Sequence, residues 1–166
     1  LDISAAKALE SALARERDTL ARVMESSGSG IVVVDGKGGV VFANAAAERV
    51  LGRRVSAGDC LLSLLGSADV ADLAGNRVSA AELPVARALA GEPGMHALRH
   101  EIIWPDGERR AVAVTSARLS APGTDHAVVI TFTDITVEMQ NEARLRLAMT
   151  AAETANRAKS DFLAAM

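Results

Sequence analysis

Two long stretches without glycine or proline lie at the ends of the chain, and the first, from about Ser4 to Glu25, carries a helical pattern. Ala6, Leu13 and Leu20 recur there at heptad spacing, the repeat of an amphipathic helix with one apolar face. Glu16 falls on the same face and weakens it. The pattern predicts an N-terminal helix and leaves open whether this helix pairs with its own copy or folds back on the rest of the chain.

Two valine-rich runs follow, Ile31–Val34 and Val40–Ala43, and each is short and β-branched, as buried strands are. The glycine-rich segment Asp35–Gly39 between them is typical of a hairpin turn. We therefore expect a β-hairpin. A short helix should come next, capped by Asn44 and ended by Gly52.

The middle of the chain, residues 53–80, has a weak pattern, and we expect a helix only over Ala57–Leu65. Ser79 and Glu82 have the three-residue spacing of a capping box. They predict a second helix over Ala80–Ala90, which a glycine- and proline-containing segment then ends.

Three extended segments come next: Met95–Trp104, Arg109–Leu119 and Ala127–Ile135. Turn residues separate them at Pro105–Glu108 and at Ala121–Asp125. Hydrophobic and small residues alternate in the second segment, as in a strand with one covered face. The three segments therefore predict an antiparallel meander.

The order of elements is helix, two strands, short helices, three strands and a long helix. It predicts an α+β fold, in which a five-stranded antiparallel sheet carries short helices on one face. In the second of the three segments, Val112, Val114 and Ser116 alternate with Ala111, Ala113 and Thr115, as expected for a sheet with one covered face. The predicted parts are an N-terminal helix at residues 1–25, a sheet domain at 26–136 and a C-terminal helix at 137–166.

The C-terminal helix has no predicted end within the chain, and its small and apolar residues follow a heptad pattern. Small side chains at such a seam let two helices approach closely. We therefore expect a parallel homodimer, and the alternative is an exposed connector helix that pairs only at high concentration. The a and d positions are Leu145, Ala148, Ala152, Ala155, Phe162 and Met166, with Lys159 as the polar member.

Composition argues against several classes of partner and location. The chain has 166 residues, with 18 Lys and Arg against 21 Asp and Glu and a formal net charge of −3. This charge is spread without a basic stripe, which argues against nucleic acid as a partner. A single cysteine, Cys60, excludes an internal disulfide. Apolar runs such as Ile31–Val34 are far too short to cross a bilayer, so we expect a cytoplasmic location, with a membrane-anchored parent protein still open.

Candidate catalytic and metal-binding residues are few. His96 and His100 lie at even spacing on one predicted strand and are expected at the surface or its rim, and His126 is expected at a strand start. Cys60 is expected as a small buried side chain. Neither a phosphate-binding glycine loop nor a nucleophile motif has the required spacing. We predict no catalytic residue and no metal site in this chain.

The segment Gly30–Asn44, the turn at Asp106–Gly107 and the tripeptide Asp134-Ile135-Thr136, in this order and spacing, resemble a PAS domain. The resemblance covers about Met24–Thr136. It implies a sensory or regulatory domain in which Asp134, Ile135 and Thr136 pass a change in the sheet to the following helix. Ile135 would stay on the sheet while Asp134 or Thr136 caps the helix, and the alternative is an ordinary capped helix start.

The family resemblance also bears on cofactors. Haem-binding PAS domains usually take a ligand from the middle helix, here Ala80–Ala90, which has no histidine. Flavin-binding relatives use a cysteine in an Asn-Cys-Arg-Phe-Leu-Gln motif, which the sequence around Cys60 does not match. With no tyrosine and one tryptophan, Trp104, few aromatic walls are available for a planar group. We therefore predict neither haem nor flavin, and the ligand or signal stays open.

The last twelve residues, Ala155–Met166, resemble the start of the dimerisation and phosphoacceptor helix of sensor histidine kinases. The resemblance implies a parent ATP-dependent histidine kinase whose phosphoacceptor histidine and ATP-binding domain follow Met166. A response regulator or phosphotransfer protein would be its downstream partner. The alternatives are a ligand-free PAS module for dimerisation or protein docking, or a PAS regulator of another output domain.

Overall fold

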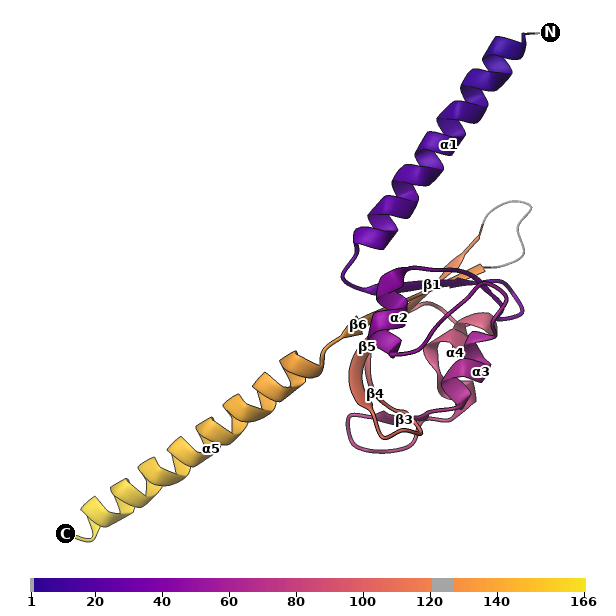
Figure 1. The fold of residues 1–166 in the computed structure, drawn as a ribbon. Coiled ribbons are helices and arrows are strands. Elements are labelled where there is room, and N and C mark those ends of the chain that lie inside the picture. Colours follow the sequence, from indigo (N-terminus) through magenta and orange to yellow (C-terminus); the bar gives the residue numbers. More distant parts are fainter. Residues whose placement is uncertain (1, 121–126) are drawn as a thin grey trace. The chain divides into compact units, whose positions relative to one another are not determined.

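The computed structural model describes residues 2–120 and 127–166, so the turn predicted at Ala121–Asp125 and His126 lie outside the described residues. The chain forms two compact units, residues 1–134 and 135–166. The first unit holds the 3-10 helix η1 (Ala80–Glu82) and the helices and strands of Figure 1 that precede residue 135. These are α1 (Ile3–Ser26), β1 (Gly30–Val34), β2 (Val40–Ala43), α2 (Ala45–Leu51), α3 (Leu61–Gly66), β3 (Asp69–Asp72), α4 (Pro84–Leu89), β4 (Met95–Ile103), β5 (Arg109–Leu119) and β6 (Ala127–Asp134). The second unit is the helix α5 (Thr136–Ala164).

The described strands form one antiparallel sheet in the order β2-β1-β6-β5-β4-β3. The predicted α+β class and the hairpin of β1 and β2 are confirmed, but the sheet has six strands and not five. The additional strand β3 lies in the weakly patterned middle of the chain. It is a strand because it pairs with β4, where Val70 lies opposite Ile102, and four residues carry too little local preference to reveal this.

The first predicted middle helix begins later than expected, because the residues before it pair with β2. Gly58 donates its N–H to the carbonyl of Val40 at 2.8 Å, and Val40 donates to the carbonyl of Asp59 at 2.8 Å. These backbone groups are therefore unavailable to a helix, and α3 starts only at Leu61.

The second predicted middle helix is divided into η1 and α4. Leu83 between them has φ −59° and ψ 140°, an extended conformation that proline imposes on the residue before it. The predicted capping box is confirmed, because Ser79 donates its backbone N–H to the Glu82 carboxylate at 2.9 Å and the reciprocal bond is present. Pro84 then starts α4, where its missing N–H costs little.

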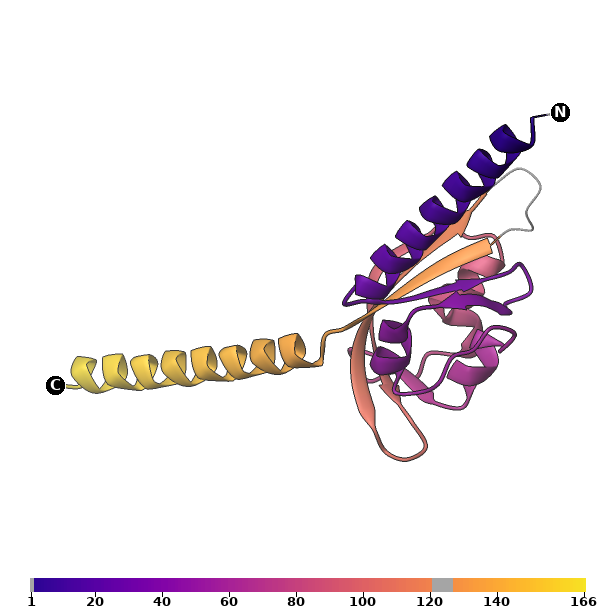
Figure 2. The ribbon, with the colours of Figure 1, turned by 45° about the horizontal axis from the view of Figure 1, so that its top comes forward.

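The core lies between the sheet and α2, α3 and α4, which gather on one of its faces (Figures 1 and 2). Alternate residues of β5 point into it, which confirms the predicted alternation, and Val112, Val114 and Ser116 form the buried face. Trp104 and Phe132 are the largest fully buried side chains. Burial of each such side chain contributes roughly 1.5 to 3 kcal/mol.

Gly30 sets the distance between β1 and α2. A Cβ atom at this position would lie 2.6 Å from the Cα of Ala47 and 3.0 Å from its backbone nitrogen. Because the obstacle is backbone, it cannot move aside as a flexible side chain would. The close approach of strand and helix therefore requires glycine here.

We predict that Gly30→Ala lowers the free energy of unfolding by about 1 to 3 kcal/mol, as overpacking does. Gly28→Ala is the matched control, since a Cβ there meets nothing within 4 Å, and it should change stability by less than about 0.5 kcal/mol. Urea unfolding followed by circular dichroism measures both. Equal stability of the two variants would contradict the packing described for Gly30.

Candidate signal-transmission site

The buried amide of Asn44 joins four segments at the start of the sheet. Its Oδ1 accepts hydrogen bonds from the backbone N–H groups of Ile31 at 2.8 Å and Ala47 at 2.9 Å. Its Nδ2 donates to the carbonyls of Met24 at 2.6 Å and Ser29 at 3.1 Å. The predicted cap of α2 is confirmed, and every hydrogen-bonding position of the amide is used. One side chain thus holds the end of α1, the following linker, β1 and α2.

Two further contacts strengthen this end of the domain. The backbone N–H of Ala45 donates to the Glu25 carboxylate at 2.9 Å. The hydroxyl groups of Ser29 and Thr133 lie 2.9 Å apart and form a hydrogen bond. Because β1 and β6 are antiparallel neighbours, the start of β1 lies beside the end of β6. The segment that follows α1 therefore touches the residue that precedes Asp134.

The tripeptide Asp134-Ile135-Thr136 lies where β6 ends and α5 begins. Asp134 is the last residue of β6, Ile135 occupies the N-cap position of α5 without a side-chain capping bond, and Thr136 is the first helical residue. The Asp134 carboxylate lies 3.9 Å from Nη1 of Arg110. The role of these three residues in transmission stays a prediction.

Arg110 connects β5 with the end of α2 and with the turn before β5. Its Nη1 donates to the backbone carbonyls of Arg49 and of Val50, the latter at 3.2 Å. Its Nε and Nη2 donate to Oε1 of Glu108 at 2.8 and 2.7 Å. The planar guanidinium group suits such divergent contacts, which an ammonium group cannot reproduce.

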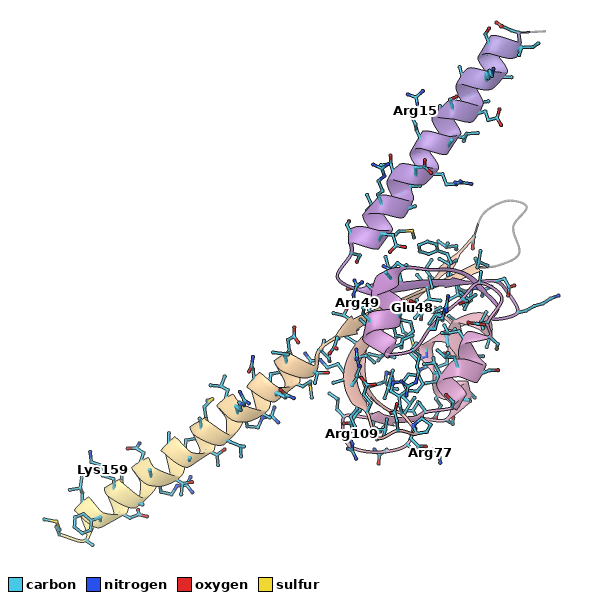
Figure 3. The ribbon with its side chains drawn as sticks, viewed as in Figure 1. Arg15, Glu48, Arg49, Arg77, Arg109 and Lys159 are labelled. Carbon is cyan, nitrogen blue, oxygen red and sulfur yellow. The ribbon has the colours of Figure 1, made fainter. Side chains whose placement is uncertain are left out.

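Arg53 extends this polar cluster toward the turn between β4 and β5. Its guanidinium group lies over the Trp104 ring, 4.6 Å from the centroid, and pairs with the Asp106 carboxylate at 2.5 Å. Hydrogen bonds from the Glu108 N–H and from Arg53 lower the pKa of Asp106. Figure 3 shows Glu48 and Arg49 on the neighbouring helix α2. An electrostatic network thus surrounds the carboxyl end of α2.

Arg110 is a functional candidate that the motifs of the sequence do not indicate, although its position in the strand gives a signal. In β5, Arg110 has the same parity as Val112 and Val114, which point into the core. A charged residue on the covered side of a strand indicates that polar partners lie near its end. Their identity depends on α2, far away in the sequence.

With this geometry established, comparison with known proteins gives the family. The family model described as the PAS fold matches residues 24–140. The chain belongs to the PAS fold family. Its PAS domain is therefore of a sensory, non-enzymatic type that serves signal transduction.

Solved PAS domains from distant organisms share this fold. The PAS domain of an HTR-like protein from Haloarcula marismortui is 23% identical, with 78% of this chain and 99% of that chain covered and a TM-score of 0.53. The PAS domain of Bordetella pertussis BvgS is 14% identical, with coverage of 82% and 98% and a TM-score of 0.52. That of the fruit-fly ELK potassium channel is also 14% identical, with coverage of 72% and 97% and a TM-score of 0.53. These likenesses concern the fold alone.

No curated protein matches the sequence.

Across residues 2–120 and 127–166, no group of three or more His, Cys, Asp and Glu side chains is placed to hold a metal ion. Within the same ranges, no helix combines the length and hydropathy needed to span a bilayer.

A partly open apolar pocket of about 20 Å³ lies between the sheet and α4, and a second pocket of about 280 Å³ shares Leu65, Val70 and Leu83 with it. The smaller pocket has room for about one water molecule, whereas pockets for organic ligands usually measure about 300 Å³ or more. His100 is the one polar side chain in the lining of the smaller pocket, which otherwise consists of apolar residues. These include Leu65, Val70, Leu83, Val85 and Phe132.

The prediction that His100 lies at the surface or its rim is wrong. The side chain is buried, with 8% of its surface exposed. It lies opposite Val112 on the core face of β4. A bulge before Leu98, where Ala97 has φ +49°, shifts the strand register, so even spacing from His96 does not preserve the environment. His96 is exposed as expected. Burial lowers the pKa of His100, although a backbone hydrogen bond with Leu98 and the Asp72 carboxylate oppose the shift.

The prediction that Cys60 is a small buried side chain is also wrong, because its side chain is exposed. It occupies the N-cap position of α3, and the next residue, Leu61, takes the buried place. The Ser63 hydroxyl and N–H lower the pKa of the Cys60 thiol through hydrogen bonds. Spacing within a helix decides which residue is buried, and α3 starts one residue too late for Cys60 to face the core.

The predicted dimer seam lies along α5 and just past its end. None of the 29 residues of α5 is buried, and Figure 3 labels Lys159, the polar member of the seam, on this helix. The seam stays a prediction, and all its residues are exposed in the single chain. They are Leu145, Ala148, Ala152, Ala155, Phe162 and Met166.

We predict that Arg110→Ala lowers the free energy of unfolding by about 1 to 2 kcal/mol, because carbonyl and carboxylate groups lose charged hydrogen bonds that are partly screened by solvent. Arg110→Lys should recover less than half of the loss. The neighbouring Arg109 is the control, since it makes one 3.7 Å pair with Glu101, and its alanine variant should stay within about 0.5 kcal/mol. Urea unfolding would contradict the network if both alanine variants behaved alike.

We also predict a pH dependence from His100. Its folded pKa lies below the unfolded value of 6.5, so the unfolded chain binds the proton more readily. Stability is therefore complete above the unfolded pKa and falls as the pH drops below it. Urea unfolding from about pH 7.5 to about pH 5.5 should show a decline that is smaller in His100→Leu and unchanged in His96→Leu. An identical decline in all three proteins would exclude His100 as its source.

Proposed function

We propose that this PAS domain regulates a sensor histidine kinase by passing a signal through paired C-terminal helices. One observation carries the proposal: α5 follows Asp134 at the end of β6 and continues into Ala155–Met166, whose sequence resembles the kinase dimerisation helix. In that reading the phosphoacceptor histidine and the ATP-binding domain follow Met166. A response regulator or phosphotransfer protein then receives the phosphoryl group.

The exposed surface of α5 supports pairing with a second copy. Most helical stability in proteins comes from packing of an apolar face, and no residue of α5 is buried in the single chain. Leu145 and Phe162 at the seam expose 63% and 66% of their surface. A parallel homodimer would bury both, and the alanines between them would keep the contact small enough to readjust.

In this dimer, a change at the end of β6 alters the direction or rotation of α5. The paired helices then have two arrangements, one that favours autophosphorylation and one that favours dephosphorylation. The signal shifts the populations of these arrangements and needs no new state. We expect the domain in the cytoplasm, where response regulators act.

A second candidate function is a PAS module that binds no small ligand and serves as a docking surface for another protein. The pocket of about 20 Å³ beside His100 favours it, because a pocket of this size is too small for an organic ligand. Both functions are compatible with a protein-mediated input, and they differ in whether α5 must pair.

We predict that Leu145→Glu weakens dimerisation at least about tenfold, because it places like charges at the seam. Leu147→Glu is a matched control, since Leu147 is 72% exposed on the same helix but lies outside the seam, and it should leave dimerisation unchanged. Sedimentation equilibrium of the 166-residue chain measures both.

The same two variants test the regulatory role in a histidine kinase that contains this chain. Leu145→Glu should change autophosphorylation, and Leu147→Glu should not. A wild-type chain that stays monomeric, or kinase activity that responds equally to both variants, would refute the paired-helix function and favour the docking module.

A further inference from the structure

We propose that the input of this domain is the state of α1, and that a linear path of hydrogen bonds carries it to α5. The α1–β6 path consists of Met24, Asn44, Ser29 and Thr133. The inference rests on the proposed function, because it concerns the signal that the C-terminal helices receive.

The first step of the α1–β6 path fixes the end of α1 to the linker that follows it. Asn44 Nδ2 donates to the Met24 carbonyl at 2.6 Å and to the Ser29 carbonyl at 3.1 Å. Asn44 is only 1% exposed, and its Oδ1 is held by the N–H groups of Ile31 and Ala47. The amide cannot rotate without breaking these bonds, so a turn of the last residues of α1 displaces Ser29.

The second step crosses from the linker to β6. The Ser29 and Thr133 hydroxyl groups lie 2.9 Å apart, just beyond the ladder in which Gly30 pairs with Phe132. Thr133 precedes Asp134, the last residue before the second unit. A displacement of Ser29 therefore acts on the backbone from which α5 starts.

The helix α1 is suited to be the moving part. None of its 24 residues is buried, and its apolar side chains form an exposed face that Glu16 interrupts. A change in what covers this face would change the orientation of its last turn. The exposed residues are Leu9, Leu13, Leu20 and Val23.

The apolar pocket beside His100 is too small for an organic signal. Its volume of about 20 Å³ admits about one water molecule. A path along the α1–β6 contacts needs no bound ligand, because it uses groups that are already in contact.

The test forces a change in α1 and measures the start of α5. A parallel leucine zipper is fused ahead of Leu1, and hydrogen exchange of amides 136–142 is measured by mass spectrometry with and without the zipper. We expect the zipper to change exchange there by about threefold to tenfold, the range for gain or loss of one hydrogen bond. The double variant Ser29→Ala with Thr133→Val should abolish the change.

The controls separate the path from a general loss of stability. Ser26→Ala with Thr131→Val removes one serine and one threonine hydroxyl nearby, outside the α1–β6 path, and should keep the full response. The Ser26 hydroxyl donates to the Val23 carbonyl within α1 at 2.9 Å. The single variant Thr133→Ser retains a hydroxyl at this position, and it should keep the zipper-induced change in exchange that the double variant loses.

The proposal is overturned if the zipper changes exchange equally in the Ser29–Thr133 variant and in the control, or if it changes exchange in neither. This result is independent of the dimerisation assay, because exchange at residues 136–142 is measured whether or not α5 pairs. A monomeric wild-type chain would refute the proposed function alone.

Discussion

The buried amide of Asn44 is the contact on which the start of this fold depends. Its four hydrogen bonds fix the end of α1, the linker, β1 and α2. A buried amide with an unused donor or acceptor would cost about 1 to 3 kcal/mol, so the four segments are held together or released together. Gly30 adds a steric condition, because α2 can lie over β1 only where no Cβ intervenes.

A second polar cluster lies at the other end of α2. Arg110 binds the carbonyls of Arg49 and Val50, and it lies between Glu108 and Asp134. The short helix α2 is therefore bound at both ends by polar side chains, while its inner face packs on an apolar core. These polar contacts tie α2 to the hairpin strand β1 at one end and to β5 at the other. This arrangement favours signals that travel along helix attachments.

The PAS fold sets limits on function without choosing among outputs. Solved relatives with 14 to 23% identity include a PAS domain of a potassium channel, so the sheet and its helices serve unrelated proteins. Two features outside the apolar core bear on the output of this chain: the sequence of α5 and the hydrogen bonds that run from Met24 through Asn44 and Ser29 to Thr133. The proposed kinase regulation and the proposed input both depend on these attachments.

The sequence alone determined the features that neighbouring residues decide. The hairpin, the cap by Asn44 and the alternation of β5 follow from preferences acting over a few residues, and their order indicated the α+β class and the PAS fold. Only the tertiary structure revealed the strand β3, the exposure of Cys60, the burial of His100 and the contacts of Arg110. Each depends on partners distant in the chain, and such partners are selected by packing and hydrogen-bond geometry that no local pattern encodes.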